Sequence, residues 1–253
     1  MRLANKVAIV TGAGAGMGKA VALRFAREGA QVVVAEIHAA GGKATVEAIR
    51  RAKGQAIFVT TDVSQENEVK AMVTTTMEQY SRIDILYNNA AVELHGQDAR
   101  AHELSAEIWD RTHAINLRSV WLCSKYAIPP MLEQHGGSII HVASPTGLYG
   151  CAPGYTAYSA SKGGVVALTR VMAADYARDN IRVNAIVPGT TDTPMIAPLL
   201  EDDGIRARLT ALAPLGRLGQ PDDVSGLAVF LASDESAYCT GGIYMADGGL
   251  TAV

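Results

Sequence analysis

Cysteine is scarce in this chain, and its placement argues against two kinds of protein. Only Cys123, Cys151 and Cys239 occur among 253 residues. Because they are odd in number and far apart, they fit neither a disulfide framework nor a zinc cluster. No ligand spacing with cysteines or acids is found at His102, His113, His135 and His141, so no catalytic metal is expected. We interpret the cysteines as reduced thiols of a cytoplasmic protein.

Long apolar runs and a dominant charge are also missing. The apolar run in MRLANKVAIVTG is short and ends in Thr-Gly, unlike a signal sequence, and no stretch approaches the length of a membrane span. The net charge is −3, with Lys and Arg scattered along the chain, which argues against a nucleic-acid surface. These absences predict a cytoplasmic protein that binds a small molecule and has no nucleic-acid or membrane partner.

The chain does have a regular alternation of short apolar runs and helix-length segments. Runs rich in β-branched residues predict buried strands at 6–11, 31–36, 55–60, 83–88, 137–143, 181–187 and 242–246. Helices are predicted at 17–28, 41–53, 65–81, 105–134, 156–179 and 222–233, with Pro129 and Pro130 kinking or ending the fourth. This order is typical of βαβ units. We predict one α/β domain over residues 1–253, a doubly wound parallel sheet of about seven strands with helices on both faces.

The segment from about 190 to 215 interrupts that order after the sixth predicted strand. It contains three prolines and has mixed polarity. Open α/β sheets bind ligands beyond the carboxyl ends of their strands, which is where this segment begins. We predict a substrate lid here; the alternative is a surface insertion without function.

A glycine-rich loop, TGAGAGMG, follows the first predicted strand and leads into the first predicted helix. Its glycines permit positive φ angles and let a pyrophosphate approach the amides at the helix start. Gly12, Gly16 and Gly18 have the spacing G-x-x-x-G-x-G, and not the commoner G-x-G-x-x-G. In this strand-loop-helix context the loop predicts a dinucleotide site.

Glu36 closes the second predicted strand and bears on which dinucleotide binds. An acid at this place accepts hydrogen bonds from the adenosine ribose hydroxyls and repels a 2′-phosphate. Neither Ala15 nor Ile37 supplies a compensating cation, and His38 is expected to be neutral. The position predicts NAD as the cofactor, an ordinary strand-end carboxylate being the alternative.

A phenol and an ammonium stand four residues apart in the sequence YSASK. Tyr158 and Lys162 therefore share one face of a predicted helix. Because a nearby ammonium favours the phenolate, we expect Lys162 to lower the pKa of Tyr158 and make it an acid/base group. Ser144 ends the fifth predicted strand, at the same sheet edge as the glycine loop, where its hydroxyl can bond a substrate oxygen.

Together these motifs resemble the short-chain dehydrogenase/reductase family from residue 5 to the C-terminus. Further matching motifs are DV at 62–63, NNAA at 88–91, IN at 115–116, PGTTDTP at 188–194 and ADGG at 246–249. The resemblance implies a Rossmann-like fold and NAD(P)-dependent hydride transfer on an alcohol or carbonyl. Tyr158 would be the acid/base, Ser144 would polarise the substrate oxygen, and Lys162 would hold the nicotinamide ribose. Asn116 would help to keep a water in the proton relay.

The resemblance also implies the cofactor contacts. Asp62 and Val63 would lie at the adenine and Thr193 at the nicotinamide. The full expected set is Gly12, Gly14, Ala15, Gly16, Met17, Gly18, Glu36, Ile37, Asp62, Val63, Asn89, Ala90, Ala91, Tyr158, Lys162, Pro188, Gly189, Thr191 and Thr193. The chain departs from the family pattern at Ala91, where glycine is commoner, and at Thr191, where isoleucine is commoner. One extra residue also separates Ser144 from Tyr158.

The substrate side of the site depends on loops that the sequence describes less well. Candidate contacts are His95, Ser144, Tyr149, Tyr155 and Met195. The loop VELHGQ places Glu93 and Gln97 near His95, and the three could bind a hydroxylated substrate; solvated loop residues are the alternative.

The sequence therefore predicts an NAD-dependent dehydrogenase that acts on a secondary alcohol, of the sugar, polyol or cyclic-alcohol class. One alternative is an NADPH-dependent carbonyl or 3-oxoacyl reductase, and a more remote one is a non-catalytic protein that senses NAD. A homotetramer is expected, since family members commonly assemble through the long fourth helix and the Tyr-Lys helix. Trp109 and Trp121 would then face another subunit, burial in the monomer core being the alternative.

Overall fold

Seven parallel strands form the central sheet of this computed structural model, which describes residues 1–252. The strands are β1 (Val7–Thr11), β2 (Gln31–Glu36), β3 (Gln55–Thr60), β4 (Ile85–Asn88), β5 (Gly137–Val142), β6 (Ile181–Pro188) and β7 (Ile243–Ala246). Their order is β3-β2-β1-β4-β5-β6-β7, and every neighbouring pair is parallel. The predicted Rossmann-like doubly wound sheet is confirmed.

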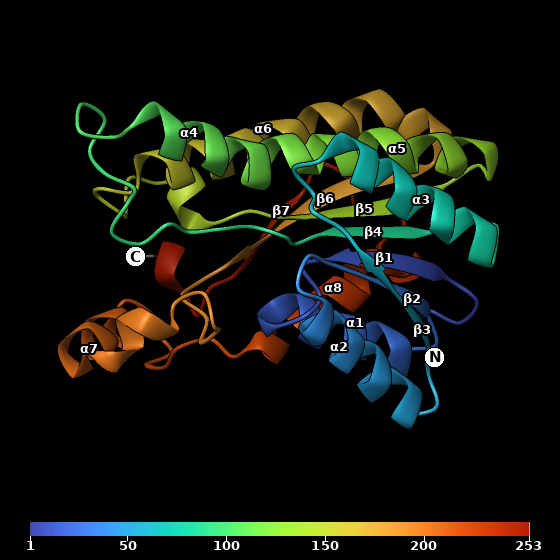
Figure 1. Cartoon of the computed structure of the whole chain (residues 1–253), viewed down its shortest axis with the longest axis horizontal. Helices are drawn as coiled ribbons and strands as arrows, with labels where there is room; N and C mark the ends of the chain where they lie inside the picture. The colour runs from blue at the N-terminus through green and yellow to red at the C-terminus, as the bar shows by residue number, and fades with distance from the viewer. Residues whose placement is uncertain (253) are drawn as a thin grey trace.

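Helices cover both faces of the sheet (Figure 1). One face carries α3 (Glu66–Tyr80), α4 (Ala106–His113), α5 (Ser119–Glu133) and α6 (Thr156–Tyr176). The other face carries α1 (Gly16–Arg27), α2 (Ala39–Arg51) and α8 (Ser225–Ala232). The short helix α7 (Asp203–Ala211) lies outside both layers, beyond one end of the sheet. No described helix combines the length and the apolar character needed to cross a bilayer.

The burial of the strands explains why they read as unbroken apolar runs. In β1, Val10 packs with Phe25 of α1 in one core cluster, while the neighbouring Ile9 packs with Met72 of α3 in the other. All four side chains are fully buried. Because successive residues of a strand point to opposite faces, a strand that is covered on both sides needs apolar side chains at every position.

The active-site candidates come together because the sheet reverses its winding between β1 and β4. The chain moves outward from β1 to β2 and β3, then returns to β4 on the other side of β1. The loops that follow β1 and β4 therefore diverge and leave a crevice at the carboxyl edge. The glycine loop follows β1, Asn89 follows β4, Ser144 follows β5 and Gly189 follows β6.

The long helix predicted at 105–134 is divided into three parts. Between α4 and α5 lies one π-helical segment, Ala114–Arg118. Of the two predicted effects of Pro129 and Pro130, kinking or ending the helix, the second is wrong, because α5 continues to Glu133. The prolines remove backbone donors, but Met131 beyond them is fully buried. Its packing holds the last turn in place.

Both tryptophans of this region lie at the surface. Trp109 of α4 is 39% exposed and Trp121 of α5 is 44% exposed. The alternative that they are buried in the monomer core is therefore wrong.

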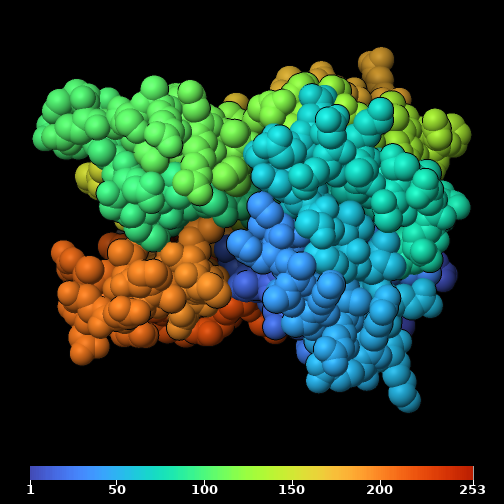
Figure 2. Space-filling model, viewed as in Figure 1, coloured from blue at the N-terminus to red at the C-terminus, as the bar shows by residue number. Residues whose placement is uncertain are grey.

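The segment at 190–215 is largely helical. It contains the 3-10 turn Ala197–Glu201 and then α7. In Figure 2 this segment, in orange, faces the green segment around residues 95–115 across a notch at the left edge of the molecule. The notch lies at the end of the sheet where the site residues gather.

Candidate active site

The glycine loop forms a cradle that side chains would fill. Gly12 has φ +63°, and a Cβ at Gly18 would lie 2.2 Å from the carbonyl oxygen of Gly12. The loop therefore needs glycine at both places. It leads into α1, whose N-terminus has no side-chain cap and no acidic residue in its first turn. The free amides of such a helix end suit a pyrophosphate, so the loop fits a dinucleotide.

Glu36 lies directly against this loop. One carboxylate oxygen accepts a hydrogen bond from the Gly14 amide at 3.0 Å and the other accepts one from the His38 amide at 3.0 Å. The residue is 9% exposed, whereas the neighbouring Ile37 is 50% exposed. The two backbone bonds fix the carboxylate at the end of β2, where an adenosine ribose binds in dinucleotide folds.

Asn89 and Ala90 brace the loop from the side of β4. Both of their amides donate to the Thr11 hydroxyl, at 3.0 and 3.1 Å. The Asn89 side chain donates to the carbonyls of Thr11 and Gly12, at 3.1 and 3.2 Å. Ala91 follows them and is partly exposed. The NNAA motif is thus placed beside the TGAGAGMG motif.

The remaining predicted cofactor residues lie along the same edge. Val63 is buried just after β3, and the Asp62 carboxylate accepts hydrogen bonds from Ser64. Pro188 ends β6, and Thr191 donates to the carbonyl of Gly189 at 3.0 Å. Thr193 lies over the glycine loop, since a Cβ at Gly16 would come within 3.4 Å of it. Ala15 and Met17 flank Gly16 at the start of α1.

Tyr158, Lys162 and Ser144 are brought together at the first turns of α6. Tyr158 and Lys162 lie on α6, and the Lys162 Nζ is 5.7 Å from the centroid of the Tyr158 ring. Ser144 is buried just beyond β5. Its hydroxyl lowers the pKa of Tyr158.

Burial is the largest influence on the pKa values of both Tyr158 and Lys162. Burial raises the pKa of Tyr158, and the Glu93 carboxyl raises it further, while the Ser144 hydroxyl lowers it. The Lys162 ammonium instead donates to the carbonyl of Val142 at 2.8 Å. Burial lowers the pKa of Lys162 to about 8, with Glu93 acting in the opposite direction. In this structure the pKa of Tyr158 is set mainly by burial, so the expectation that Lys162 lowers it stays a prediction.

Asn116 lies on the π-helical segment and is fully buried. Its side chain accepts a hydrogen bond from the Val92 amide at 2.8 Å and donates to the Val92 carbonyl at 2.8 Å. It also donates to the hydroxyl of Ser161 on α6 at 3.3 Å. Asn116 thus ties the loop after β4 to the helix that carries Tyr158.

The structure adds two polar residues that the sequence reasoning missed. Asp98 accepts hydrogen bonds from the amides of Ala157 and Tyr158, at 3.1 and 2.9 Å, and so caps the start of α6. Thr146 donates to the Ser144 hydroxyl at 3.1 Å. An Asp sixty residues before the helix it caps leaves no local signal. Thr146, by contrast, could have been found from the sequence, because Ser-Pro-Thr at 144–146 is typical of a turn with side-chain hydrogen bonds.

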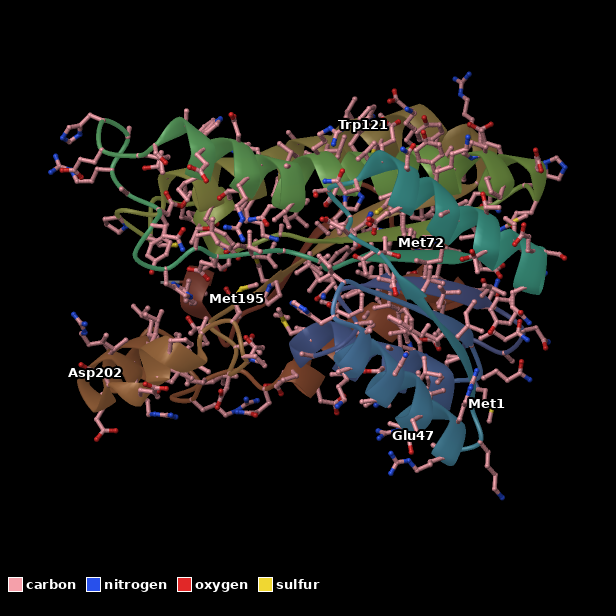
Figure 3. All side chains as sticks on the ribbon, viewed as in Figure 1. Met1, Glu47, Met72, Trp121, Met195 and Asp202 are labelled. Atoms are coloured by element: carbon pink, nitrogen blue, oxygen red, sulfur yellow. The ribbon has the colours of Figure 1, made fainter. Side chains whose placement is uncertain are left out.

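Three of the predicted substrate residues form one hydrogen-bonded group. His95 Nδ1 lies 3.0 Å from the Tyr155 hydroxyl, and His95 Nε2 lies 3.1 Å from the Met195 carbonyl oxygen. The rings of His95 and Tyr155 meet edge to face. Figure 3 shows Met195 between α7 and the upper helical layer. Tyr149 is 52% exposed in the loop after Ser144.

Comparison with known proteins agrees with this geometry. A family model described as enoyl-(acyl carrier protein) reductase matches residues 12–251. The chain belongs to the short-chain dehydrogenase/reductase family. Within residues 1–252 no three His, Cys, Asp or Glu side chains gather as metal ligands.

Individual members of the short-chain dehydrogenase/reductase family match along their whole length. The uncharacterized oxidoreductase YxbG of Bacillus subtilis is 46% identical, covering 99% of this chain and 93% of the relative. The 3-oxoacyl-[acyl-carrier-protein] reductase FabG of Thermotoga maritima is 41% identical, covering 99% of both chains. The cis-4-hydroxycyclohexanecarboxylate dehydrogenase of Sinomonas cyclohexanicum is 40% identical, covering 99% of this chain and 98% of the relative.

Among solved structures, levodione reductase superposes with a TM-score of 0.94 at 33% identity, covering 100% of both chains. The protein is thus an oxidoreductase of this family that acts on an alcohol or carbonyl group with a nicotinamide dinucleotide.

Proposed function

We propose that this oxidoreductase is an NAD-dependent dehydrogenase that oxidises a secondary alcohol of the sugar, polyol or cyclic-alcohol class. We base the preference for NAD over NADP on the Glu36 carboxylate, which the amides of Gly14 and His38 hold against the glycine loop. A 2′-phosphate there would meet a fixed negative charge. The Sinomonas relative, named for a cyclic hydroxy acid, supports a cyclic alcohol as substrate.

The proposed chemistry moves one proton and one hydride. The cofactor, when bound, supplies an acceptor for the hydride and a positive charge on its ring. Tyr158 removes the proton of the substrate hydroxyl while the carbinol carbon loses its hydride and the carbonyl forms. Ser144, oriented by Thr146 at 3.1 Å, donates to the substrate oxygen and stabilises its developing charge.

Lys162 and Asn116 support this step from within the protein. Lys162 is 3% exposed and directs its ammonium to the Val142 carbonyl, beside the Tyr158 ring. In the proposal it also bonds the ribose of the cofactor and adds positive charge next to the phenolate. Asn116 joins the loop after β4 to α6 by hydrogen bonds and helps to hold a water in the proton relay.

A Tyr158→Phe variant tests the assignment of the base. Loss of the hydroxyl removes the proton acceptor, so turnover is expected to fall by at least about a thousandfold. NAD binding, measured by calorimetry, is expected to persist. Tyr238→Phe is the matched control, because the Tyr238 side chain is fully exposed. A Tyr158→Phe enzyme that retains most of its rate would refute the mechanism.

The second candidate is an NADPH-dependent carbonyl or 3-oxoacyl reductase. The name of the Thermotoga relative and the description of the family model favour it, whereas Glu36 opposes it. Reduction of a 3-oxoacyl thioester with NADPH, at a rate far above alcohol oxidation with NAD, would establish this reading. A non-catalytic NAD sensor is the remote alternative, and the presence of both Tyr158 and Lys162 argues against it.

We also propose that the segment at 190–215 is a substrate lid. The hydrogen bond between His95 Nε2 and the Met195 carbonyl joins it to the loop on the opposite side of the notch. The bond holds the lid over the site described above. His95→Phe is expected to raise the KM for the alcohol more than it lowers kcat.

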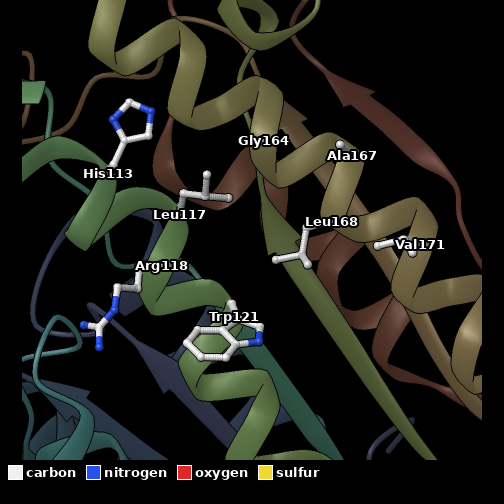
Figure 4. Close-up of a pocket in the computed structure, with 8 residues that line it drawn as sticks. All are labelled: His113, Leu117, Arg118, Trp121, Gly164, Ala167, Leu168 and Val171. Carbon is white, nitrogen blue, oxygen red and sulfur yellow. The ribbon is translucent and has the colours of Figure 1, made fainter. Parts of the chain in front are cut away.

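A homotetramer is the proposed assembly. A groove of about 620 Å³ separates α5 from α6 and is almost wholly apolar (Figure 4). Its walls include Leu117, Trp121, Ala167, Leu168 and Val171. Trp121 and Val171 are 44% and 51% exposed. An apolar surface of this kind supports an interface between copies of the chain.

A further inference from the structure

The mechanism above gives no part to the side chain of Glu93, a titratable group of the site. It follows β4 in the loop that Asn116 holds through both backbone groups of Val92. The position of Glu93 is therefore set by the same residue that contacts α6. Its side chain is 19% exposed, so most of the side chain is buried while the carboxyl stays accessible from the crevice.

Glu93 is close to the reacting groups. Its carboxyl raises the pKa of Tyr158 and acts against the lowering of the Lys162 pKa. It also raises the pKa of Tyr155. The contacts agree with this, because Glu93 lies 4.0 Å from His95 Nδ1, and His95 bonds the hydroxyl of Tyr155 directly before the helix that carries Tyr158. Any alcohol that reaches Tyr158 therefore comes near Glu93.

No hydrogen bond to the Glu93 carboxylate is found among residues 1–252, because its neighbours are bonded elsewhere. His95 Nδ1 lies 4.0 Å away, beyond hydrogen-bonding distance, and both its ring nitrogens are used by Tyr155 and the Met195 carbonyl. The Lys162 ammonium donates to the Val142 carbonyl.

Asp98, the other acid of this loop, is different. Its two oxygens accept the amides of Ala157 and Tyr158. Of the two carboxyl groups, one is fully used in capping α6 and the other, Glu93, has acceptor sites to spare. With most of its side chain buried and no protein donor, the Glu93 carboxyl has lost part of its hydration, at a cost that the protein does not offset. A bound molecule that brings a donor would remove that cost.

We propose that Glu93 is a specificity-determining residue, which accepts a hydrogen bond from a second hydroxyl of the substrate while Tyr158 acts on the first. The preferred substrates are then neutral diols or polyols and not simple secondary alcohols. This inference rests on the proposed function, since it needs alcohol oxidation at Tyr158.

A hydroxyl is a better match for Glu93 than an ammonium or a carboxylate group. A second carboxylate would meet two acids, Glu93 and Asp98; burial already raises the pKa of Glu93, and Asp98 adds to that rise. An ammonium would have to lose its hydration beside the Lys162 charge, at a greater cost than a neutral hydroxyl. A hydroxyl supplies the missing donor at the lowest desolvation cost.

The test compares cyclohexanol with the cis and trans isomers of cyclohexane-1,2-, 1,3- and 1,4-diol, with NAD as oxidant. A hydrogen bond to a charged acceptor predicts that at least one diol exceeds cyclohexanol in kcat/KM by at least about tenfold. In Glu93→Met that ratio is expected to fall to about one. Glu93→Gln, which keeps a neutral acceptor, should give an intermediate ratio. Because both substrates react at Tyr158, the ratio cancels any effect of the substitutions on the pKa of Tyr158.

Glu103→Gln is the matched control on the same loop. Its side chain is 51% exposed and pairs only with Arg100 and His102 at the surface, so the ratio should not change. Equal rates for cyclohexanol and every diol would overturn the inference, as would a preference that survives in Glu93→Met. Faster oxidation of 4-aminocyclohexanol than of any diol would overturn the choice of a neutral substrate. All these results leave alcohol oxidation by NAD intact, whereas failure to oxidise any alcohol would overturn the proposed function itself.

Discussion

Replacing Lys162 by methionine is expected to stabilise the fold while it abolishes the activity. Lys162 is 3% exposed, and burial lowers its pKa from 10.5 to about 8. Each pKa unit corresponds to about 1.4 kcal/mol, so keeping Lys162 charged in the folded protein costs on the order of 3 kcal/mol near neutral pH. Methionine removes that cost but also loses the hydrogen bond to the Val142 carbonyl, which offsets about 1 kcal/mol of the stabilisation. The net stabilisation is about 2 kcal/mol, which raises the Tm by roughly 4–8 °C.

The pH dependence of this effect has a definite sign. The folded-state pKa of Lys162 lies below the unfolded one, so the unfolded chain binds more protons between the two values. The cost is fully present below about pH 8 and is lost as the pH rises toward about 10.5. The stability difference between Lys162→Met and wild type should therefore shrink as the pH rises.

Denaturant unfolding at about pH 7 and about pH 9.5 measures both quantities. Lys70→Met is the control, because Lys70 is exposed on α3 and its replacement should change the stability by less than about 0.5 kcal/mol. A Lys162→Met protein that is less stable than wild type at neutral pH would refute the reasoning. So would a stability difference that grows with pH.

Three further substitutions test other parts of the account. In Glu36→Ala the ratio of kcat/KM with NAD to that with NADP should fall at least about tenfold, and an unchanged ratio would contradict the assignment of NAD. In Gly18→Ala the new Cβ would lie 2.2 Å from the Gly12 carbonyl oxygen, so calorimetry should show at least about a tenfold loss of NAD affinity. The control Gly226→Ala, with no atom within 4 Å of the new Cβ, should bind NAD as wild type does. A Gly18→Ala protein that binds NAD as tightly as Gly226→Ala would contradict the assignment of the glycine loop as the dinucleotide site. In Val171→Asp light scattering should show dissociation of the tetramer, and a wild-type protein with the mass of one chain would refute that assembly.

Much of the fold follows from the sequence because the strands are buried on both faces. In Val7–Thr11 the first four residues are apolar, and all five residues are buried in the sheet. The loops after β1, β4 and β5 meet at one edge by topology alone. That is why motifs far apart in the sequence, such as the glycine loop and Ser144, could be assigned to one site before the structure was known.

The details of the site depend on contacts between distant residues, which a linear pattern does not contain. Spacing places Lys162 beside Tyr158, but the direction of its ammonium is decided by the Val142 carbonyl, twenty residues away. Likewise, Asp98 and Glu93 lie in the same loop, yet Asp98 caps α6 and Glu93 has no protein donor. The continuation of α5 beyond Pro130 is decided by the burial of Met131.

The central claim is that this protein oxidises a secondary alcohol with NAD. The most direct test follows the near-ultraviolet absorbance of reduced nicotinamide, with purified protein, NAD or NADP, and a panel of sugars, polyols, cyclic alcohols and hydroxy acids. The account predicts turnover with NAD and at least one of the sugar, polyol or cyclic-alcohol classes. Turnover with NADP alone, or reduction of 3-oxoacyl thioesters by NADPH in the absence of any alcohol oxidation, would contradict it.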